Sequence, residues 1–329
     1  MKPILHRRAL LNASLGLCAW PLLGTAQAQT KESYPVKPVR VVIGLPAGGV
    51  ADNTMRVLTS QMQPAFGQPF VIDNKPGGSF AIAMNAMTQA PADGYTLMHV
   101  TNMMLAAQAV LKRYDMLKAL VPIATLGASD MALAVGGKGP YKTVKELIEF
   151  GRAHPGKLTY AVPGIGTLEH LTLAAFCNRN GIKAVSVPFK GGPEVVQAIA
   201  AGECDFCVTP VPFLVQFESK GLLRGLVLLN EQRNAALPAL PTYREAGVDV
   251  PRLVLWGALA APVGTPAAVI ATLEKQALAA NVMPDVRRQL LAMGLDPSFS
   301  GGAEFTAKLW AEDWAWIAKS ASDVPVDKN

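Results

Sequence analysis

The chain has 329 residues, with 30 lysines and arginines against 24 aspartates and glutamates, and half of its residues are hydrophobic. This length is sufficient for one large or two medium α/β domains. No Lys/Arg cluster follows the N-terminal segment, which argues against a nucleic-acid-binding protein.

Residues 1–28 have the pattern of an export signal. A basic start, MKPILHRR, precedes the short apolar stretch ALLNASLGLCAWPLLG and the small-residue cleavage pattern AQA. We expect cleavage after Ala28 and a periplasmic mature protein of residues 29–329. Arg7-Arg8 leaves twin-arginine export open beside ordinary secretion. Cleavage removes three cations and no acid, so the mature chain keeps 27 Lys and Arg against 24 acids, a net charge of +3.

Strand-like and helix-like segments alternate from residue 39 onward. This alternation predicts parallel strands joined by crossover helices. The predicted strands are 39–44, 69–74, 95–100, 131–137, 157–162, 184–189, 204–209 and 222–229, and the first helices are 51–65, 79–90 and 142–154.

The last hundred residues are predicted to be mostly helical. Thr143 with Glu146, and Thr242 with Glu245, have capping-box spacing. Thr265 is the expected N-cap of a helix that starts with Pro266. Trp310, Trp314 and Ile317 recur at helical spacing and predict a buried face; these residues belong to the segment LWAEDWAWIAKS.

Two α/β lobes follow from this order of elements. The apolar strands 131–137 and 222–229 flank the middle block, so we infer that they cross between the lobes. The first lobe would comprise residues 29–130 and 230–329, and the second lobe residues 131–229. Clefts between such lobes are favoured ligand sites.

Three cysteines remain after cleavage, and an odd number leaves at least one thiol unpaired. The segment ECDFCVT resembles a redox motif but is predicted to be a strand. Side chains three apart in a strand point to opposite faces, so Cys204 and Cys207 should not form a disulfide. We expect these two cysteines and Cys177 to be structural.

The residues give little sign of catalysis. The mature chain has three histidines, His99, His154 and His170, with no metal-ligand spacing. Neither a nucleophile elbow nor a phosphate loop is present. In GIGTLE, Glu169 stands where a dinucleotide fingerprint requires its third glycine. We therefore expect no metal, no cofactor and no enzyme activity.

Four glycine-rich turns follow predicted strands: PAGGVAD (46–52), KPGGSF (75–80), PGIGTLEH (163–170) and FKGGPE (189–194). Such turns lie at the carboxyl ends of parallel strands, where ligands bind. Each exposes backbone N–H groups near the positive end of a helix dipole, which favours an anion. A single glycine turn can be a tight connection only, but four of them favour a cleft that binds a carboxylate.

Several longer segments resemble the substrate-binding proteins of tripartite tricarboxylate transporters, the Bug family. These segments are YPVKPVRVVIGLPAGGVADNTMRVL, VIDNKPGGSFAIA, APADGYTLM, KTVKELIEFGRAHPGKLTYAVPGIGTLEHL, VPFKGGPEVVQAIAAGE, LPALPTYREAGV and WGALAAPVGTP. The resemblance covers nearly all of the mature chain. It implies a two-lobed periplasmic binding protein of type II, with a mixed sheet flanked by helices in each lobe. Such a protein closes on a small carboxylic acid and delivers it to a membrane permease, here as a monomer.

The resemblance also implies the binding residues. The turns at 46–52 and 164–170 face each other, backbone amides hold one carboxylate, and Asp52 assists through ordered water. Helix capping by Asp52 and a packing role for His170 are the alternatives. The residues expected to bind the ligand are Pro46, Ala47, Gly48, Gly49, Asp52, Gly77, Gly78, Gly164, Gly166, Thr167, His170, Lys190 and Gly191.

Several positions depart from the family pattern. The family commonly has Phe-Pro-Pro or Phe-Pro-Ala before the glycines, while this chain has Gly44-Leu45-Pro46-Ala47. Val162 replaces a usual serine, and Ser79-Phe80 replace further glycines. These changes would suit a more apolar or aromatic acid. Two other functions stay open: a ligand-binding subunit of a membrane sensor, which the sequence does not separate from transport, and a periplasmic hydrolase, which the missing nucleophile–base pair disfavours.

Overall fold

Nine strands form a mixed sheet in the computed structural model, which describes residues 34–189 and 191–323. The strand order is β2-β1-β3-β9-β4-β7-β5-β6, and β8 pairs with β4. β1 is parallel to β2 and β3, and β5 is parallel to β6 and β7, whereas β4 and β9 are antiparallel to their neighbours. The predicted α/β class with mixed sheets is therefore confirmed. The strands are β1 (Val39–Ile43), β2 (Phe70–Asn74), β3 (Thr96–Thr101), β4 (Leu120–Gly136), β5 (Leu158–Val162), β6 (Ala184–Pro188), β7 (Phe206–Pro210), β8 (Leu223–Leu228) and β9 (Val254–Pro262).

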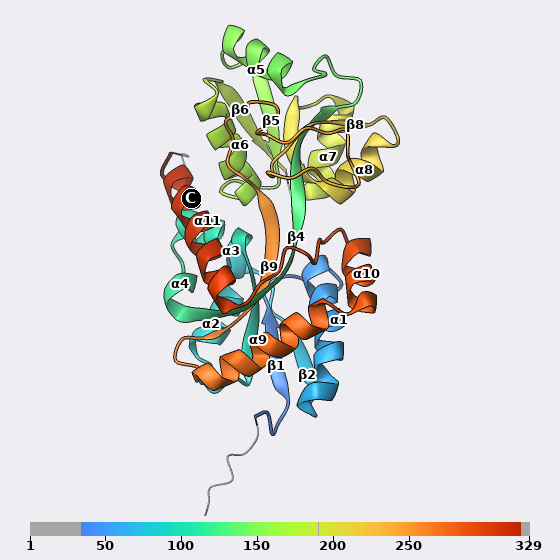
Figure 1. Cartoon of the computed structure of the whole chain (residues 1–329). Coiled ribbons are helices and arrows are strands. Elements are labelled where there is room, and N and C mark those ends of the chain that lie inside the picture. The colour runs from blue at the N-terminus through green and yellow to red at the C-terminus, as the bar shows by residue number, and fades with distance from the viewer. Residues whose placement is uncertain (1–33, 190, 324–329) are drawn as a thin grey trace, which may run out of the picture. The chain divides into compact units, whose positions relative to one another are not determined.

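Helices follow most strands and cover both faces of the sheet (Figure 1). Residues 1–28, the predicted export signal, lie outside the described residues. Among the described helices, none combines the length and the apolar character that a membrane crossing needs. The helices are α1 (Val50–Phe66), the short 3-10 helix η1 (Gly78–Phe80), α2 (Ala81–Thr88), α3 (Asn102–Leu111), α4 (Met116–Ala119), α5 (Val144–Ala153), α6 (Leu168–Arg179), α7 (Gly192–Ala201), α8 (Val211–Glu218), α9 (Ala267–Asn281), α10 (Pro284–Ala292) and α11 (Ala303–Asp323).

Two long strands connect the halves of the sheet. Residues 120–130 of β4 pair with β9, and residues 131–136 pair with β7 and β8. Figure 1 shows β4 and β9 running between the part built on β1–β3 and the part built on β5–β8. We call these parts the first and the second lobe. The C-terminal ends of β1 and β5, where the predicted binding turns begin, therefore belong to different lobes.

The second crossing differs from the prediction. β8, at the predicted crossing 222–229, pairs with β4 beside β7 and stays in the second lobe. The chain returns through β9, which the sequence did not reveal as a strand. Residues 241–249, assigned above to the first lobe, bond to the second: Leu228 N–H donates to Pro241 O, and the Asn180 side chain donates to Asp249 O at 2.7 Å. The predicted boundary at residue 229 therefore lies too early.

The C-terminal helix α11 packs against β4, α3 and α6. Trp310 and Ile317 are buried in the main core, as predicted from their spacing, and Trp314 is partly buried beside them. Asp313, on the same helix, accepts hydrogen bonds from Trp256 Nε1 at 2.6 Å and from Asn102 Nδ2 at 3.2 Å. Burial raises the pKa of the Asp313 carboxyl. This helix thereby ties the returning strand β9 to the start of α3.

The predicted helix caps are mostly correct. Thr143 and Glu146 form a full capping box at α5. Thr242 and Glu245 form the same two reciprocal bonds, although in a turn rather than a long helix. Thr265 is not an N-cap: its hydroxyl donates to Pro262 O, and α9 begins at Ala267 with Pro266 as its N-cap.

All three described cysteines are free thiols and are buried. This confirms that Cys204 and Cys207 are not bonded to each other, but the reason given above was wrong. β7 begins at Phe206, so Cys204 precedes the strand, and both cysteines pack in the same apolar cluster. Burial raises the pKa of Cys177 and of Cys207 to about 12, which keeps these thiols protonated and unreactive.

Candidate functional site

The β1–α1 turn joins a buried strand to a 17-residue helix. Gly48 has φ +78°, a conformation that favours glycine, and Gly49 is the N-cap of α1 with φ −75°. No side chain caps the helix at Gly49. The backbone N–H groups of Gly49, Val50 and Ala51 have no acceptor among the described residues. The turn therefore presents donors at the positive end of a helix dipole.

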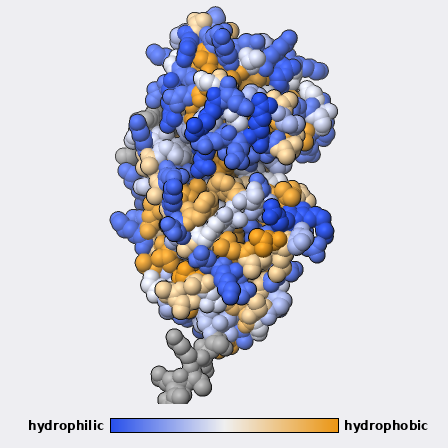
Figure 2. Space-filling view, in the orientation of Figure 1, coloured by the Kyte–Doolittle hydropathy of each residue, from blue (hydrophilic) through white to orange (hydrophobic). Residues whose placement is uncertain are grey.

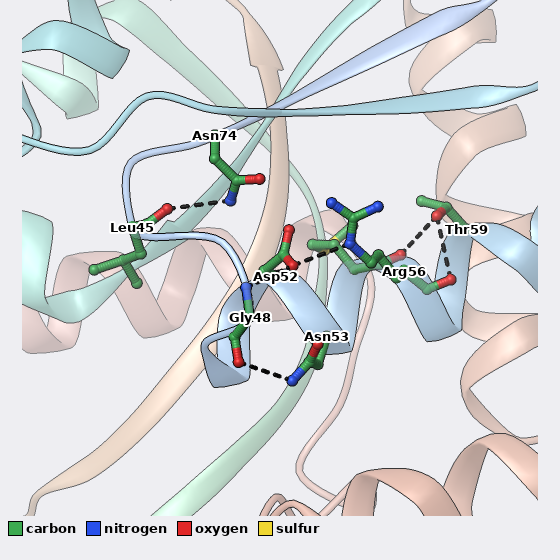
Figure 3. A network of polar contacts seen from close by, with 8 residues as sticks. Leu45, Gly48, Asp52, Asn53, Arg56, Thr59 and Asn74 are labelled. Atoms are coloured by element: carbon green, nitrogen blue, oxygen red, sulfur yellow. Dashed lines mark hydrogen bonds and ion pairs between the residues drawn. The ribbon is translucent and has the colours of Figure 1, made fainter.

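Asp52 holds this turn from inside the first lobe (Figure 3). Its side chain is 3% exposed, and Oδ2 accepts hydrogen bonds from Gly48 N–H at 2.9 Å and from Arg56 Nε at 3.0 Å. Asn74, at the end of β2, donates to Leu45 O at 3.1 Å on the other side of the turn. Because the Gly48 N–H is occupied by Asp52, the N–H groups left without an acceptor are those that follow it.

Asp52 is held as a carboxylate. The hydrogen bond from Arg56 lowers the pKa of Asp52, the bond from Gly48 adds to this effect, and burial opposes it. Oδ1 is buried without a partner among the described residues. Asp52 is not the N-cap of α1, as the helix-capping alternative had it, because that position belongs to Gly49 and no side chain caps it; Oδ2 bonds to the Gly48 N–H before the helix instead. Contact of Oδ1 with a ligand or its water stays a prediction.

The β5–α6 turn has the same construction in the second lobe. Gly164 and Gly166 have φ +140° and +76°, and Thr167 is the N-cap of α6, with its hydroxyl accepting from His170 N–H. Gly166 N–H donates to His170 Nδ1 at 3.0 Å. Gly166 and Thr167 repeat the conformations of Gly48 and Gly49, since the two N-caps have φ −71° and −75°. His170 therefore corresponds to Asp52, four residues after the bonded glycine in each case.

The second turn differs from the first in its charge. His170 is buried, and burial lowers its pKa, which favours the neutral ring. Since Nδ1 accepts from Gly166, the proton of this neutral ring is on Nε2. Burial raises the pKa of the neighbouring Glu169, whose Oε2 has no partner among the described residues. The second turn thus combines a neutral imidazole with a carboxyl group whose ionisation is disfavoured.

The turn at 75–80 has an unusual backbone. Gly77 and Gly78 have φ +110° and +58°, and the next two residues, Ser79 and Phe80, also have positive φ, at 50° and 73°. Left-handed conformations cost an L-residue about 1–2 kcal/mol each. Ser79 and Phe80, the residues noted above as departures from glycine, therefore have the backbone conformation that glycine adopts most easily. Such strain often accompanies functional sites.

The fourth turn is only partly described. Lys190, a predicted binding residue, lies outside the described residues. Gly191 is the N-cap of α7 with φ 169°, an extended conformation that any residue adopts. Val162, at the end of β5, is buried, and its backbone oxygen accepts from Phe189 N–H.

A cavity of about 190 Å³ lies beside the β1–α1 turn, and we call it the apolar cavity. Figure 2 shows hydrophobic side chains gathering near the middle of the molecule, where the lobes meet. The cavity is lined from both lobes and from the connecting strands, by Leu45, Val50, Ala51, Thr54, His99, Thr101, Met103, Leu126, Gly127, Ser129, Pro210, Pro212, Phe213, Leu255, Trp256, Gly257, Met293 and Leu295.

The predicted binding residues are only partly brought together. Leu45 and Val50, which flank residues 46–49, line the apolar cavity, whereas residues 164–170 do not. The second turn contacts the first lobe elsewhere: a Cβ at Gly166 would lie 2.7 Å from Val110 of α3. Both turns therefore lie where the lobes meet, and their joint contact with one ligand stays a prediction.

The sequence analysis missed the lining of the apolar cavity. Thr54, His99 and Phe213 belong to three elements that are far apart in the chain. No spacing pattern connects them, so the sequence carried no signal for this cavity. Among the described residues, no group of three His, Cys, Asp or Glu side chains has the arrangement of a metal site.

Comparison with known proteins places this chain among transport receptors. The family model for the tripartite tricarboxylate transporter family receptor matches residues 54–319. The UPF0065 protein in the gbd 5' region of Cupriavidus necator is 33% identical to this chain, and the match covers 94% of each of the two chains. Protein BugT of Bordetella pertussis is 30% identical, with 83% of this chain and 85% of BugT covered.

Solved structures give the same result for the fold. A TctC solute-binding protein from Polaromonas without ligand superposes with a TM-score of 0.79 at 23% identity, over 88% of this chain and 100% of that one. MatC of Rhodopseudomonas palustris with bound malate has a TM-score of 0.72 and 26% identity, with 88% and 100% covered. Rpa4515 of the same organism with adipate has a TM-score of 0.73 and 28% identity, with 88% and 98% covered.

Proposed function

This chain belongs to the tripartite tricarboxylate transporter family of receptors, the Bug family, and we propose that it captures a small organic acid outside the cytoplasm and delivers it to a membrane permease of that transporter type. In this proposal the protein is exported, cleaved after Ala28, and acts as a monomer.

One observation carries the binding part of the proposal. Two turns of the same backbone conformation each begin a long helix, one in each lobe. In each turn a side chain of that helix accepts the N–H of a glycine: Asp52 accepts from Gly48, and His170 accepts from Gly166. The following N–H groups at α1 have no acceptor among the described residues. Helix N-termini of this kind favour carboxylates. Malate and adipate in two similar structures support a carboxylate ligand here.

We propose that the site binds its ligand without converting it. Asp52 is occupied by Gly48 and Arg56, and His170 is occupied by Gly166. Neither pairs with a serine, a cysteine or another group that it could activate among the described residues. The family to which the chain belongs is one of solute-binding receptors, which is consistent with this interpretation.

A proline substitution tests the main-chain contact directly. Val50→Pro removes one N–H at the first position of α1, where proline is tolerated, and Gly49 already has the extended conformation that a residue before proline prefers. Val50→Ala is the matched control, because it shortens the same side chain and keeps the N–H. With malate and adipate as probes, we expect calorimetry to show a loss of about 1.5–3 kcal/mol for Val50→Pro only. Equal binding by both variants would contradict the main-chain contact.

Delivery needs a separate measurement. A probe at 100 times its dissociation constant should raise the free energy of unfolding by about 2.7 kcal/mol, so thermal shifts can identify the acid first. Uptake of that labelled acid should then stop in cells that lack this chain and return when the chain is restored. Restoration with Val50→Pro should be weaker than with Val50→Ala. Uptake that is unchanged without the chain would refute a role in delivery.

A further inference from the structure

The apolar cavity begins at the same turn that is proposed to hold the carboxylate. Leu45 lies directly before residues 46–49 of the turn, and Val50 directly after them. From there the cavity extends to Leu126 and Leu255 of the connecting strands and to Phe213 of α8. A ligand anchored at the N-terminus of α1 therefore has an adjoining space lined mainly by carbon atoms.

Two polar side chains line this cavity and are largely buried. Thr54 is 4% exposed, and its hydroxyl has no hydrogen bond to any described residue. His99, from β3, is 5% exposed. Burial lowers the pKa of His99 to about 4, so the ring is neutral and has one N–H to donate. Buried polar groups without partners are rare in folded proteins and require an explanation.

No lysine, arginine, aspartate or glutamate lines the apolar cavity. A carboxylate inside it would lose its hydration and find neutral donors only, at a cost of several kcal/mol. Its volume of about 190 Å³ is below that of most whole-ligand pockets. An apolar cavity of about 150 Å³ holds benzene in another protein, so this one has room for a single ring or a chain of about six carbons.

We propose that the apolar cavity receives the uncharged body of the acid, a six-membered ring or a chain of similar size, and that a neutral oxygen on this body accepts hydrogen bonds from Thr54 and His99. This inference rests on the proposed function, since the carboxylate remains at the β1–α1 turn. The preferred ligand is therefore a monocarboxylic acid with an apolar body. Dicarboxylates such as malate and adipate bind more weakly, because their second charge would enter the cavity.

Three acids and three variants test this proposal by calorimetry. The probes are 3-phenylpropanoate, 3-(4-hydroxyphenyl)propanoate and adipate. Ser129→Leu fills part of the cavity from β4, and Thr54→Val removes the unpaired hydroxyl at nearly constant shape. Thr59→Val is the matched control: Thr59 is also buried in α1, but its hydroxyl donates to Met55 O at 2.7 Å and does not line the cavity. Thermal unfolding of each variant verifies that it folds.

We expect both aromatic acids to bind the parent at least about tenfold more tightly than adipate, from burial of one ring. Thr54→Val should weaken the binding of the hydroxylated acid by about three- to tenfold, because one hydrogen bond is lost. The affinity for 3-phenylpropanoate should stay within twofold of the parent value. Thr59→Val should change neither affinity. Ser129→Leu should remove the preference for the aromatic acids.

Three results would overturn the inference in distinguishable ways. If adipate binds as tightly as the aromatic acids and Ser129→Leu has no effect, the cavity does not receive the ligand, and the proposed function stands. If no carboxylate binds, including malate, both proposals fail. An aromatic preference that survives in Ser129→Leu would place the ring elsewhere and would also refute the assignment to this cavity.

Discussion

Replacing Asp52 with Ala should destabilise the protein through the β1–α1 turn. The side chain is 3% exposed and accepts a hydrogen bond from the Gly48 N–H at 2.9 Å. A hydrogen bond to a charged group in such a place contributes about 1.5–3 kcal/mol. The bond to Arg56 adds little, because that side chain is 55% exposed and solvent screens the pair. We therefore expect Asp52→Ala to lower the free energy of unfolding by about 2 kcal/mol, or the melting temperature by about 4 °C.

The same contacts fix the direction of the pH dependence. The bond from Arg56 is the main cause that lowers the pKa of Asp52 below its ordinary value of 3.8, so the native state binds this proton less readily than the unfolded chain. The stabilisation by Asp52 is then fully present above the unfolded pKa, and it is lost as pH falls through the folded pKa. Asp52→Asn should lose stability at pH 7 and show a shallower decline below about pH 4 than the parent.

Urea unfolding followed by tryptophan fluorescence at pH 7 and pH 3 measures both effects. Asn53→Ala is the control, because Asn53 is an exposed neighbour that bonds to the same turn, with Nδ2 donating to Gly48 O at 3.1 Å. It should change the midpoint far less than Asp52→Ala. Equal midpoints for the parent and Asp52→Ala at pH 7 would refute the role of Asp52 in holding the turn.

Three other predictions follow from backbone angles and burial. Gly48→Ala should cost about 1–2 kcal/mol because of its positive φ, whereas Gly49→Ala, at φ −75°, should cost much less; paired urea curves decide this, and equal losses would contradict it. Ser79→Gly should leave stability unchanged or raise the melting temperature by relieving a φ of +50°; a clear fall would show that Ser79 makes compensating contacts. Cys207 should resist alkylation in the native protein and react after unfolding, as measured by intact mass; rapid native labelling would contradict its burial.

Much of the fold could be predicted because its strands and helices have regular local patterns. The short strands of each lobe have continuous apolar runs, and α5 and α11 have clear caps or stripes. The connecting strands lack such patterns. The first part of β4 contains Pro122 and Gly127, and its pairing with β9 shifts register near both. β9 is rich in alanine and includes Gly257, so neither β9 nor the first part of β4 had a readable period.

The two glycine turns could be predicted because each depends on residues that are neighbours in the sequence. The apolar cavity could not, because it depends on how residues far apart in the sequence pack. Glycine followed by a helix start identified both turns, since a tight turn needs positive φ locally. The apolar cavity depends on the folded arrangement of residues such as Thr54, His99 and Phe213, which no local pattern joins. Of the departures that suggested an apolar acid, Leu45 lines this cavity, whereas Val162 and Ser79-Phe80 do not.

The hydrogen bonds within the two glycine turns show what Gly48 and Gly166 do. Gly48 and Gly166 each donate their N–H to a side chain four residues later, Asp52 or His170, and not to open space. In the proposed function their part is therefore to set the geometry of the turn, and the donors for a ligand would be the N–H groups that follow. This is why a proline at Val50 is expected to affect binding more directly than an alanine at Gly48, which is expected to affect stability first.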